Sequence, residues 1–169
     1  MWLLLTYILF RNYIAYEEIM PEHILSGIKA IIAKKKKDEG MIQREIGDYL
    51  KTERSVVSHY LNGRYPSEKV LIVANEIINL DCVSGTHIIN SLSEDKELTS
   101  TLLKEIYGKN LQINIGNNCI MCGKCHQCEF DAIYTDNYTY ITKIDNNKCM
   151  LCGICLKLCD NISLTNKNK

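Results

Sequence analysis

Apolar residues recur at helical spacing between positions 22 and 36 and predict an amphipathic helix there. They are Ile24, Leu25, Ile28, Ile31 and Ile32. Four consecutive lysines follow at positions 34 to 37, where positive charge suits the C-terminal end of the helix dipole, and Gly40 ends the element. Similar patterns predict three more short helices over 42–50, 54–62 and 67–80. Residues 20–80 are therefore expected to form a small helical bundle.

In residues 81–115 the helical spacing of apolar residues is interrupted and then returns. Positions 81–92 show no clear pattern and are expected to be irregular. Ser93 is expected to cap the next helix, with acidic residues in its first turn. One face of that helix is apolar and forms either part of the core or a dimer contact; it comprises Leu98, Leu102, Leu103 and Ile106. The alternation over 111–115 predicts a short strand.

The last segment, residues 116–169, contains an internal repeat. Three cysteines at two-residue intervals, Cys119, Cys122 and Cys125, return 30 residues later, and each copy is followed by one more cysteine. The second triplet is Cys149, Cys152 and Cys155, and the following cysteines are Cys128 and Cys159. Residues 132–144 lie between the copies and predict a hairpin, because they are rich in Tyr, Thr and Ile around Asp136-Asn137.

Composition removes several classes of protein. The chain has 169 residues, 20 basic against 20 acidic, and is 46% hydrophobic, which excludes collagen-like, coiled-coil and wholly disordered chains. The apolar start, positions 1–10, has no basic flank and is shorter than the roughly 20 residues that span a bilayer. We therefore expect a cytoplasmic protein with no membrane partner. Residues 1–19 are expected to be either a short helix or a mis-assigned start.

Eight of the nine cysteines lie between Cys119 and Cys159, so a metal site is expected there. Their regular spacing and the lack of a convincing secretory signal argue against disulfides. Three thiolates at two-residue intervals can wrap three corners of an iron–sulfur cube, with the fourth corner supplied from elsewhere. Two zinc ions on paired cysteines are the alternative, but zinc does not require a third cysteine at the same interval in both copies. Iron–sulfur chemistry is favoured.

Over roughly its last 50 residues the chain resembles the two-cluster ferredoxins. The resemblance implies two 4Fe–4S clusters, one on Cys119, Cys122, Cys125 and Cys159 and the other on Cys149, Cys152, Cys155 and Cys128. Two features depart from that family: the gap before Cys128 is one residue short, and Glu129 and Asp160 replace its prolines. For this reason we expect at least the cluster that contains Cys128 to be more open to water and oxidant than the clusters of an electron carrier, which would favour a sensor.

The pair Ile46-Gly47 supplies the apolar and small residues that helix-turn-helix units need where two helices cross. From Gln43 to about Ile78, and most closely in the run from Val56 to Gly63 followed by Pro66-Ser67, the chain resembles the phage-repressor-like (XRE-type) helix-turn-helix family. The resemblance implies that Gln43 contacts a phosphate and that the helix over 54–62 faces bases. Its exposed candidates for DNA contact are Arg54, Ser55, Ser58, His59 and Asn62. Lys51 departs from the family, which prefers glycine in this turn.

Together these patterns predict an α+β protein: a helix-turn-helix domain in 20–80, a helical linker in 81–115 and a ferredoxin-like domain in 116–169. The combination resembles redox-responsive regulators of anaerobic archaea. It predicts a homodimeric regulator that binds double-stranded DNA and senses redox state, oxygen or iron supply, and that is not an enzyme. One alternative is an electron-transfer ferredoxin whose helical part docks a redox partner protein. Another is a regulator whose clusters are purely structural.

Overall fold

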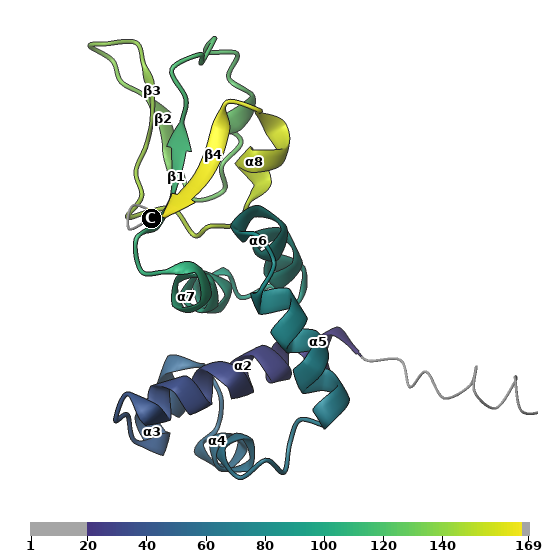
Figure 1. Ribbon diagram of the computed structural model, residues 1–169. Helices are drawn as coiled ribbons and strands as arrows, with labels where there is room; N and C mark the ends of the chain where they lie inside the picture. Colours follow the sequence, from purple (N-terminus) through teal and green to yellow (C-terminus); the bar gives the residue numbers. More distant parts are fainter. Residues whose placement is uncertain (1–19, 167–169) are drawn as a thin grey trace, which may run out of the picture.

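The computed structural model describes residues 20–166, and the expectations for residues 1–19 lie outside this range. The described chain begins with a run of helices and ends in a smaller part built from short strands (Figure 1). The helices of the first part are α2 (Pro21–Asp38), α3 (Gln43–Tyr49), α4 (Arg54–Leu61), α5 (Glu68–Ile78), α6 (Cys82–Ser91) and α7 (Lys96–Tyr107). The predicted α+β class is confirmed. None of the helices in residues 20–166 is long and apolar enough to cross a membrane.

The four helices predicted in residues 20–80 are all present. α2 packs along α5, and Gly27 permits the close approach, since a Cβ there would lie 2.8 Å from the Ala74 Cβ. A short turn joins α3 to α4, and Lys51 adopts a left-handed conformation in it with φ of 48°. Gly47 lies under this turn, because a Cβ at that position would lie 2.8 Å from the Thr52 carbonyl oxygen.

The expectation that residues 81–92 are irregular is wrong, because they form α6. Asp81 caps this helix by accepting hydrogen bonds from the backbone N–H groups of Val83 and Ser84, both at 3.0 Å. Its sequence has weak helix propensity, but it is held by tertiary packing. Gly85 lies against the Tyr107 ring, leaving no room for a side chain, and Thr86 is fully buried.

The helix that follows is capped by Asp95 and not by Ser93. The Asp95 carboxylate accepts from the Leu98 N–H at 3.0 Å, whereas the Ser93 hydroxyl accepts from the N–H of Asp95 itself at 3.2 Å. The apolar face of α7 packs in the core of the chain, where Leu102 and Leu103 are fully buried. Its stripe is therefore core, which leaves it unavailable as a dimer contact.

The second part of the chain contains two antiparallel strand pairs. β1 (Leu111–Ile115) pairs with β4 (Ile162–Asn166), which joins the two ends of the cysteine-rich segment. β2 (Ile133–Thr135) and β3 (Thr142–Ile144) form the predicted hairpin. The Asp136 carboxylate orders the connection by accepting from the N–H groups of residues 138 and 139 and from the Lys143 ammonium. The first cysteine loop lies between β1 and β2 in the sequence, and the second lies between β3 and β4.

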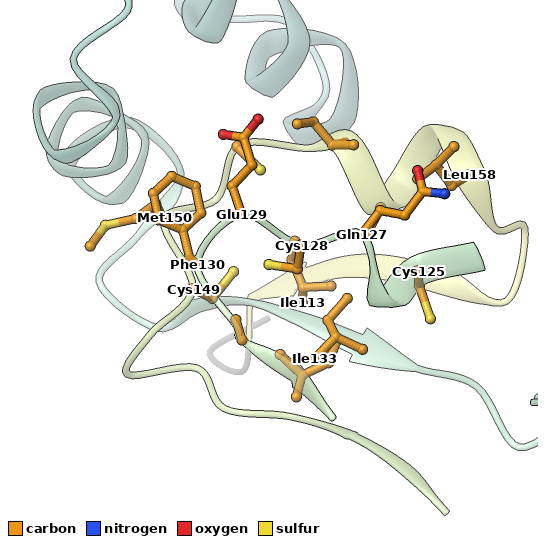
Figure 2. Close-up of a pocket in the computed structure, with 15 residues that line it drawn as sticks. Ile113, Cys125, Gln127, Cys128, Glu129, Phe130, Ile133, Cys149, Met150 and Leu158 are labelled. Carbon is orange, nitrogen blue, oxygen red and sulfur yellow. The ribbon is translucent and has the colours of Figure 1, made fainter. Parts of the chain in front are cut away.

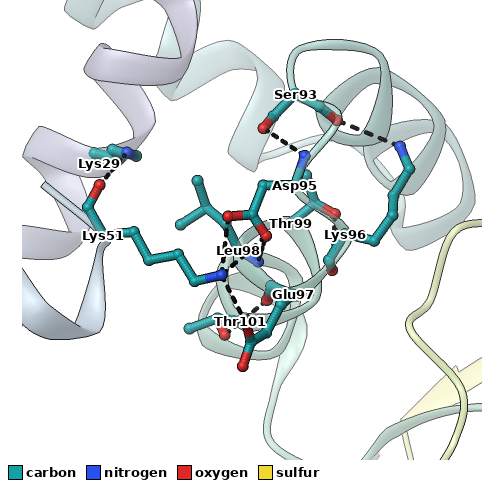
Figure 3. Close-up of polar contacts among 9 residues, drawn as sticks. All are labelled: Lys29, Lys51, Ser93, Asp95, Lys96, Glu97, Leu98, Thr99 and Thr101. Carbon is teal, nitrogen blue, oxygen red and sulfur yellow. Dashed lines mark hydrogen bonds and ion pairs between the residues drawn. The ribbon is translucent and has the colours of Figure 1, made fainter.

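Two sets of charged contacts attach α7 to the first helices. On the surface, the Lys51 ammonium donates to Asp95 at 2.9 Å and to Glu97 at 2.7 Å (Figure 3). In the interior, the Lys36 ammonium of α2 lies 2.8 Å from the Glu105 carboxylate of α7, and both side chains are only 5% exposed. The Tyr49 hydroxyl of α3 donates to the same carboxylate at 2.7 Å. Three helices thus meet at one buried ion pair.

Removing one partner of this buried pair should be costly. Lys36→Met leaves the Glu105 carboxylate buried without its main counter-charge, so we expect the free energy of unfolding to fall by about 3 kcal/mol. Burial alone would raise the pKa of Glu105, but hydrogen bonds from Lys36 and Tyr49 lower it below its ordinary value of 4.5. The stabilisation is therefore present above about pH 4.5 and is lost as the pH falls further.

Anaerobic urea unfolding followed by far-ultraviolet circular dichroism measures this loss. Lys35→Met is the matched control, because Lys35 is 53% exposed and lies 3.5 Å from the same carboxylate. We expect the control to lose less than about 1 kcal/mol. Equal losses in the two variants would contradict a special role for the buried pair.

Candidate metal centre

The two cysteine triplets lie in loops with the same backbone conformation. Met121 and Leu151, at equivalent positions, both have φ of 53°, and Gly123 and Gly153 have φ of 75° and 76°. Each glycine begins a helical turn, namely η1 (Lys124–His126) in the first copy and α8 (Ile154–Leu158) in the second. Left-handed residues at matching places curve both loops alike. The repeat in the sequence is thus a repeat in the structure.

The eight thiols gather in two sets of four. Burial raises the pKa of Cys125, and the nearby thiols of Cys159, Cys119 and Cys122 raise it further. Burial likewise raises the pKa of Cys155, to about 12, with contributions from Cys149, Cys152 and Cys128. In each set the fourth member comes from the other copy of the repeat. These are the two sets that the ferredoxin resemblance implies.

The crossing of the fourth cysteine is visible in the side-chain directions. Figure 2 shows the Cys128 and Cys149 thiols pointing towards one another, whereas the Cys125 thiol points away from both. The turn η1 places Cys125 and Cys128 on adjacent parts of the backbone. Neighbouring cysteines of one copy therefore serve different sets.

The two sets differ in their surroundings. The Cys119 set lines a cavity of about 180 Å³ that also includes exposed backbone of the first loop. The Cys128 set lines a tighter cavity of about 20 Å³, whose other walls include Ile113, Phe130 and Ile133. Cys125 lies on the boundary of both. The second site is the more enclosed and the more apolar.

The expectation that at least the cluster containing Cys128 is more open to oxidant than in an electron carrier finds no support in this enclosure and stays a prediction. The missing proline is replaced by Glu129, which is exposed, and in Figure 2 its carboxylate points away from the thiols of Cys128 and Cys149. The walls of this cavity come from the strands and the cysteine loops, and α6 covers the second loop from outside the cavity. The Asn90 side-chain amide donates to the Leu151 carbonyl at 2.8 Å, and Leu151 is 2% exposed. Sequence reasoning missed Asn90, because residues 81–92 carry no periodic signal.

The donor chemistry fits iron–sulfur clusters. Thiolates are the usual ligands of such clusters. Burial raises the pKa of the Cys155 thiol, and the positive charge of bound iron would lower it again, because binding requires a deprotonated thiol. Within residues 20–166, no group of three His, Cys, Asp or Glu side chains is arranged to hold a single metal ion. His126 is exposed and contacts the Thr135 hydroxyl at 3.4 Å. Cys82 is half-buried on α6, where its thiol donates to the Leu164 carbonyl at 3.8 Å.

The structure places most of the residues predicted to contact DNA on one helix. Arg54, Ser55 and His59 are exposed on α4, and Ser58 is half-buried there. Asn62 follows the helix and donates its side-chain amide to the Ser58 carbonyl at 2.8 Å. Gln43 is the first residue of α3 and is half-buried. Their contacts with DNA remain a prediction.

Comparison with known proteins identifies a relative that spans nearly the whole chain. The ferredoxin-type protein FwdE of Methanocaldococcus jannaschii is 48% identical over 145 residues, which cover 86% of this chain and 96% of that protein. No family model matches the chain. No solved structure matches it either. The extent and identity of the match show that the chain belongs to the family of ferredoxin-type proteins represented by this relative.

Proposed function

We propose that the chain is an iron–sulfur electron-transfer protein that holds two 4Fe–4S clusters. The observation that carries this proposal is the grouping of eight thiols into two crossed sets of four. Such clusters supply one-electron storage when bound. The relative supports the carrier over a DNA-binding regulator, because it is named a ferredoxin-type protein and the match covers 86% of this chain.

The residues of the chain hold and insulate the two centres in different ways. The left-handed positions in each loop bend the backbone around the thiols. The apolar side chains Ile113, Ile133 and Phe130 keep water from the Cys128 set. Because Cys125 borders both cavities, the two centres are neighbours, and an electron accepted by one can pass to the other.

In this proposal the helical part, residues 20–107, docks the carrier on its redox partner and performs no catalysis itself. α6 and α7 join it to the cysteine-rich part, since α6 contacts β4 and α7 contacts β1. The buried Lys36–Glu105 pair fixes α7 on α2 and so fixes the helices relative to the cluster sites. With this connection, docking of the helical part on the partner would also set the position of the cysteine-rich part.

Anaerobically prepared protein should contain about eight irons and eight sulfides per chain. Cys119→Ser and Cys149→Ser should each lose about four irons and weaken retention of the rest, since Cys128 and Cys159 cross between the sets. Cys82→Ser is the control and should keep the full content, because its thiol lies outside both sets. Iron, sulfide and zinc analysis measures the result, and stoichiometric zinc without iron would overturn the assignment.

The cluster in the Cys119 set should be the first to be lost in air, because its loop is exposed and its cavity is larger. Cys122→Ser and Cys152→Ser are matched variants at equivalent positions of the repeat. Visible absorption after air exposure should bleach several times faster in Cys152→Ser, whose remaining cluster is the open one. Equal bleaching in both variants would show that the difference in enclosure does not control access of oxidant.

DNA binding is a second candidate function, favoured by the α3–α4 unit. Gly47 packs under the turn, and α4 leaves Arg54, Ser55 and His59 exposed on one element, as a recognition helix requires. In that case the chain would bind a two-fold operator as a dimer. Strong, sequence-specific binding that changes with the state of the clusters would favour this function over electron transfer.

If α4 reads DNA, Arg54→Ala should cost about 1 to 3 kcal/mol of binding and relax the preference at one base pair, because its guanidinium can pair with guanine. Gln43→Ala should weaken binding to all sequences equally, with little change in salt dependence, since a neutral amide displaces no counterion. Selection of binding sites from a random pool measures both. Arg64→Ala is the charge-matched control beyond the helix, and unchanged preferences in Arg54→Ala would remove Arg54 from the reader.

A further inference from the structure

The two cysteine loops share one backbone conformation but differ in how they are covered. Met121 is 56% exposed and its neighbour Ile120 is 81% exposed, whereas Leu151, the equivalent of Met121, is 2% exposed. A Cβ at Gly153 would lie 3.2 Å from the His87 ring, whereas one at Gly123 would meet nothing within 4 Å. The first loop is therefore an apolar surface with no cover from the described chain.

α6 shows what covers a loop of this shape. It lays the methyl of Thr86 against Gly153, where a Cβ would lie 3.3 Å away, and its Asn90 amide donates to the Leu151 carbonyl at 2.8 Å. In residues 20–166 no donor reaches the equivalent carbonyl of Met121. The first loop thus offers the same carbonyl acceptor, at Met121, and the same bare glycine, Gly123, but no helix of the described chain covers it.

We propose that the loop from Cys119 to Cys125 is a docking surface for an α-helix of a redox partner protein, which covers it as α6 covers the second loop. This inference rests on the proposed electron-transfer function. The fitting helix has an apolar face for Ile120 and Met121, a small residue opposite Gly123 and an amide side chain that donates to the Met121 carbonyl.

The chemistry of the site favours a redox partner over other occupants. The surface lies directly over the Cys119 set, whose Cys122 is exposed. A helix is about 10 Å across, so a redox group directly behind it comes within roughly that distance of the open cluster. An apolar helix also removes water from the exposed loop, as α6 does for the other set. The docked complex would enclose both clusters alike.

Photocrosslinking in the cells that produce the protein tests the surface. The full chain carries benzoylphenylalanine at Met121 or, as control, at Tyr138, which is 94% exposed on the hairpin. We expect Met121 to crosslink to a protein with its own redox group, with the crosslinked peptide mapped by mass spectrometry to a helix. Crosslinks to residues 1–19, to a second copy of the chain, or at no higher yield than at Tyr138 would overturn the proposal.

A kinetic measurement separates failure of the surface from failure of the function. With the crosslinked partner purified, Met121→Asp should slow electron exchange at least tenfold, and Tyr138→Asp should leave it unchanged. Iron content of each variant is measured alongside to show that the clusters are retained. Unmodified protein is also reduced and reoxidised with methyl viologen. Failure with viologen would refute electron transfer itself, whereas rapid exchange with viologen and equal rates for both variants with the partner would refute only the docking surface.

Discussion

The arrangement of this chain depends on the crossing of Cys128 and Cys159 between the two cysteine sets. Each set takes three thiols from one copy of the repeat and one from the other, so neither can assemble until both copies are folded. The β1–β4 pairing brings the ends of the segment together and makes this possible. A segment of about 50 residues has little core of its own, so bound clusters would contribute much of its stability.

The helices and the cysteine-rich part are held together by polar contacts as well as by apolar packing. The Lys36–Glu105 pair links α2 to α7, and Asn90 links α6 to the second cysteine loop. The Thr99 hydroxyl of α7 donates to the Asn90 carbonyl oxygen of the side chain at 3.0 Å, which joins the two links. Separate polar contacts therefore join α2 to α7, α7 to α6 and α6 to the second cysteine loop.

The sequence predicts those elements whose apolar residues recur at a regular local spacing. The four helices of residues 20–80, the strand at 111–115 and the hairpin follow from such signals. The two sets of cysteines follow from the ferredoxin resemblance, and Lys51 stands out only because the helix-turn-helix family prefers glycine in its turn. The periodic pattern misses α6 because its residues have weak helix propensity and the helix is supported by packing against Tyr107 and the second loop. The enclosure of the Cys128 set likewise depends on residues far apart in the sequence, such as Ile113 and Ile133, which the local substitution at Glu129 does not report.

An internal repeat on its own gives two equivalent sites, and two equivalent clusters would have equal reduction potentials, so neither would hold an electron in preference to the other. Here one helix breaks the symmetry, because α6 packs on Leu151 and Gly153 while Met121 and Gly123 stay bare. Adding charge to a cluster is harder in a drier site, so the enclosed cluster should have the lower reduction potential of the two. In the proposed carrier, an electron would then rest preferentially on the open cluster, next to the surface proposed for the partner. The difference in cover between the two loops would thereby make the open site the one that delivers electrons to a partner.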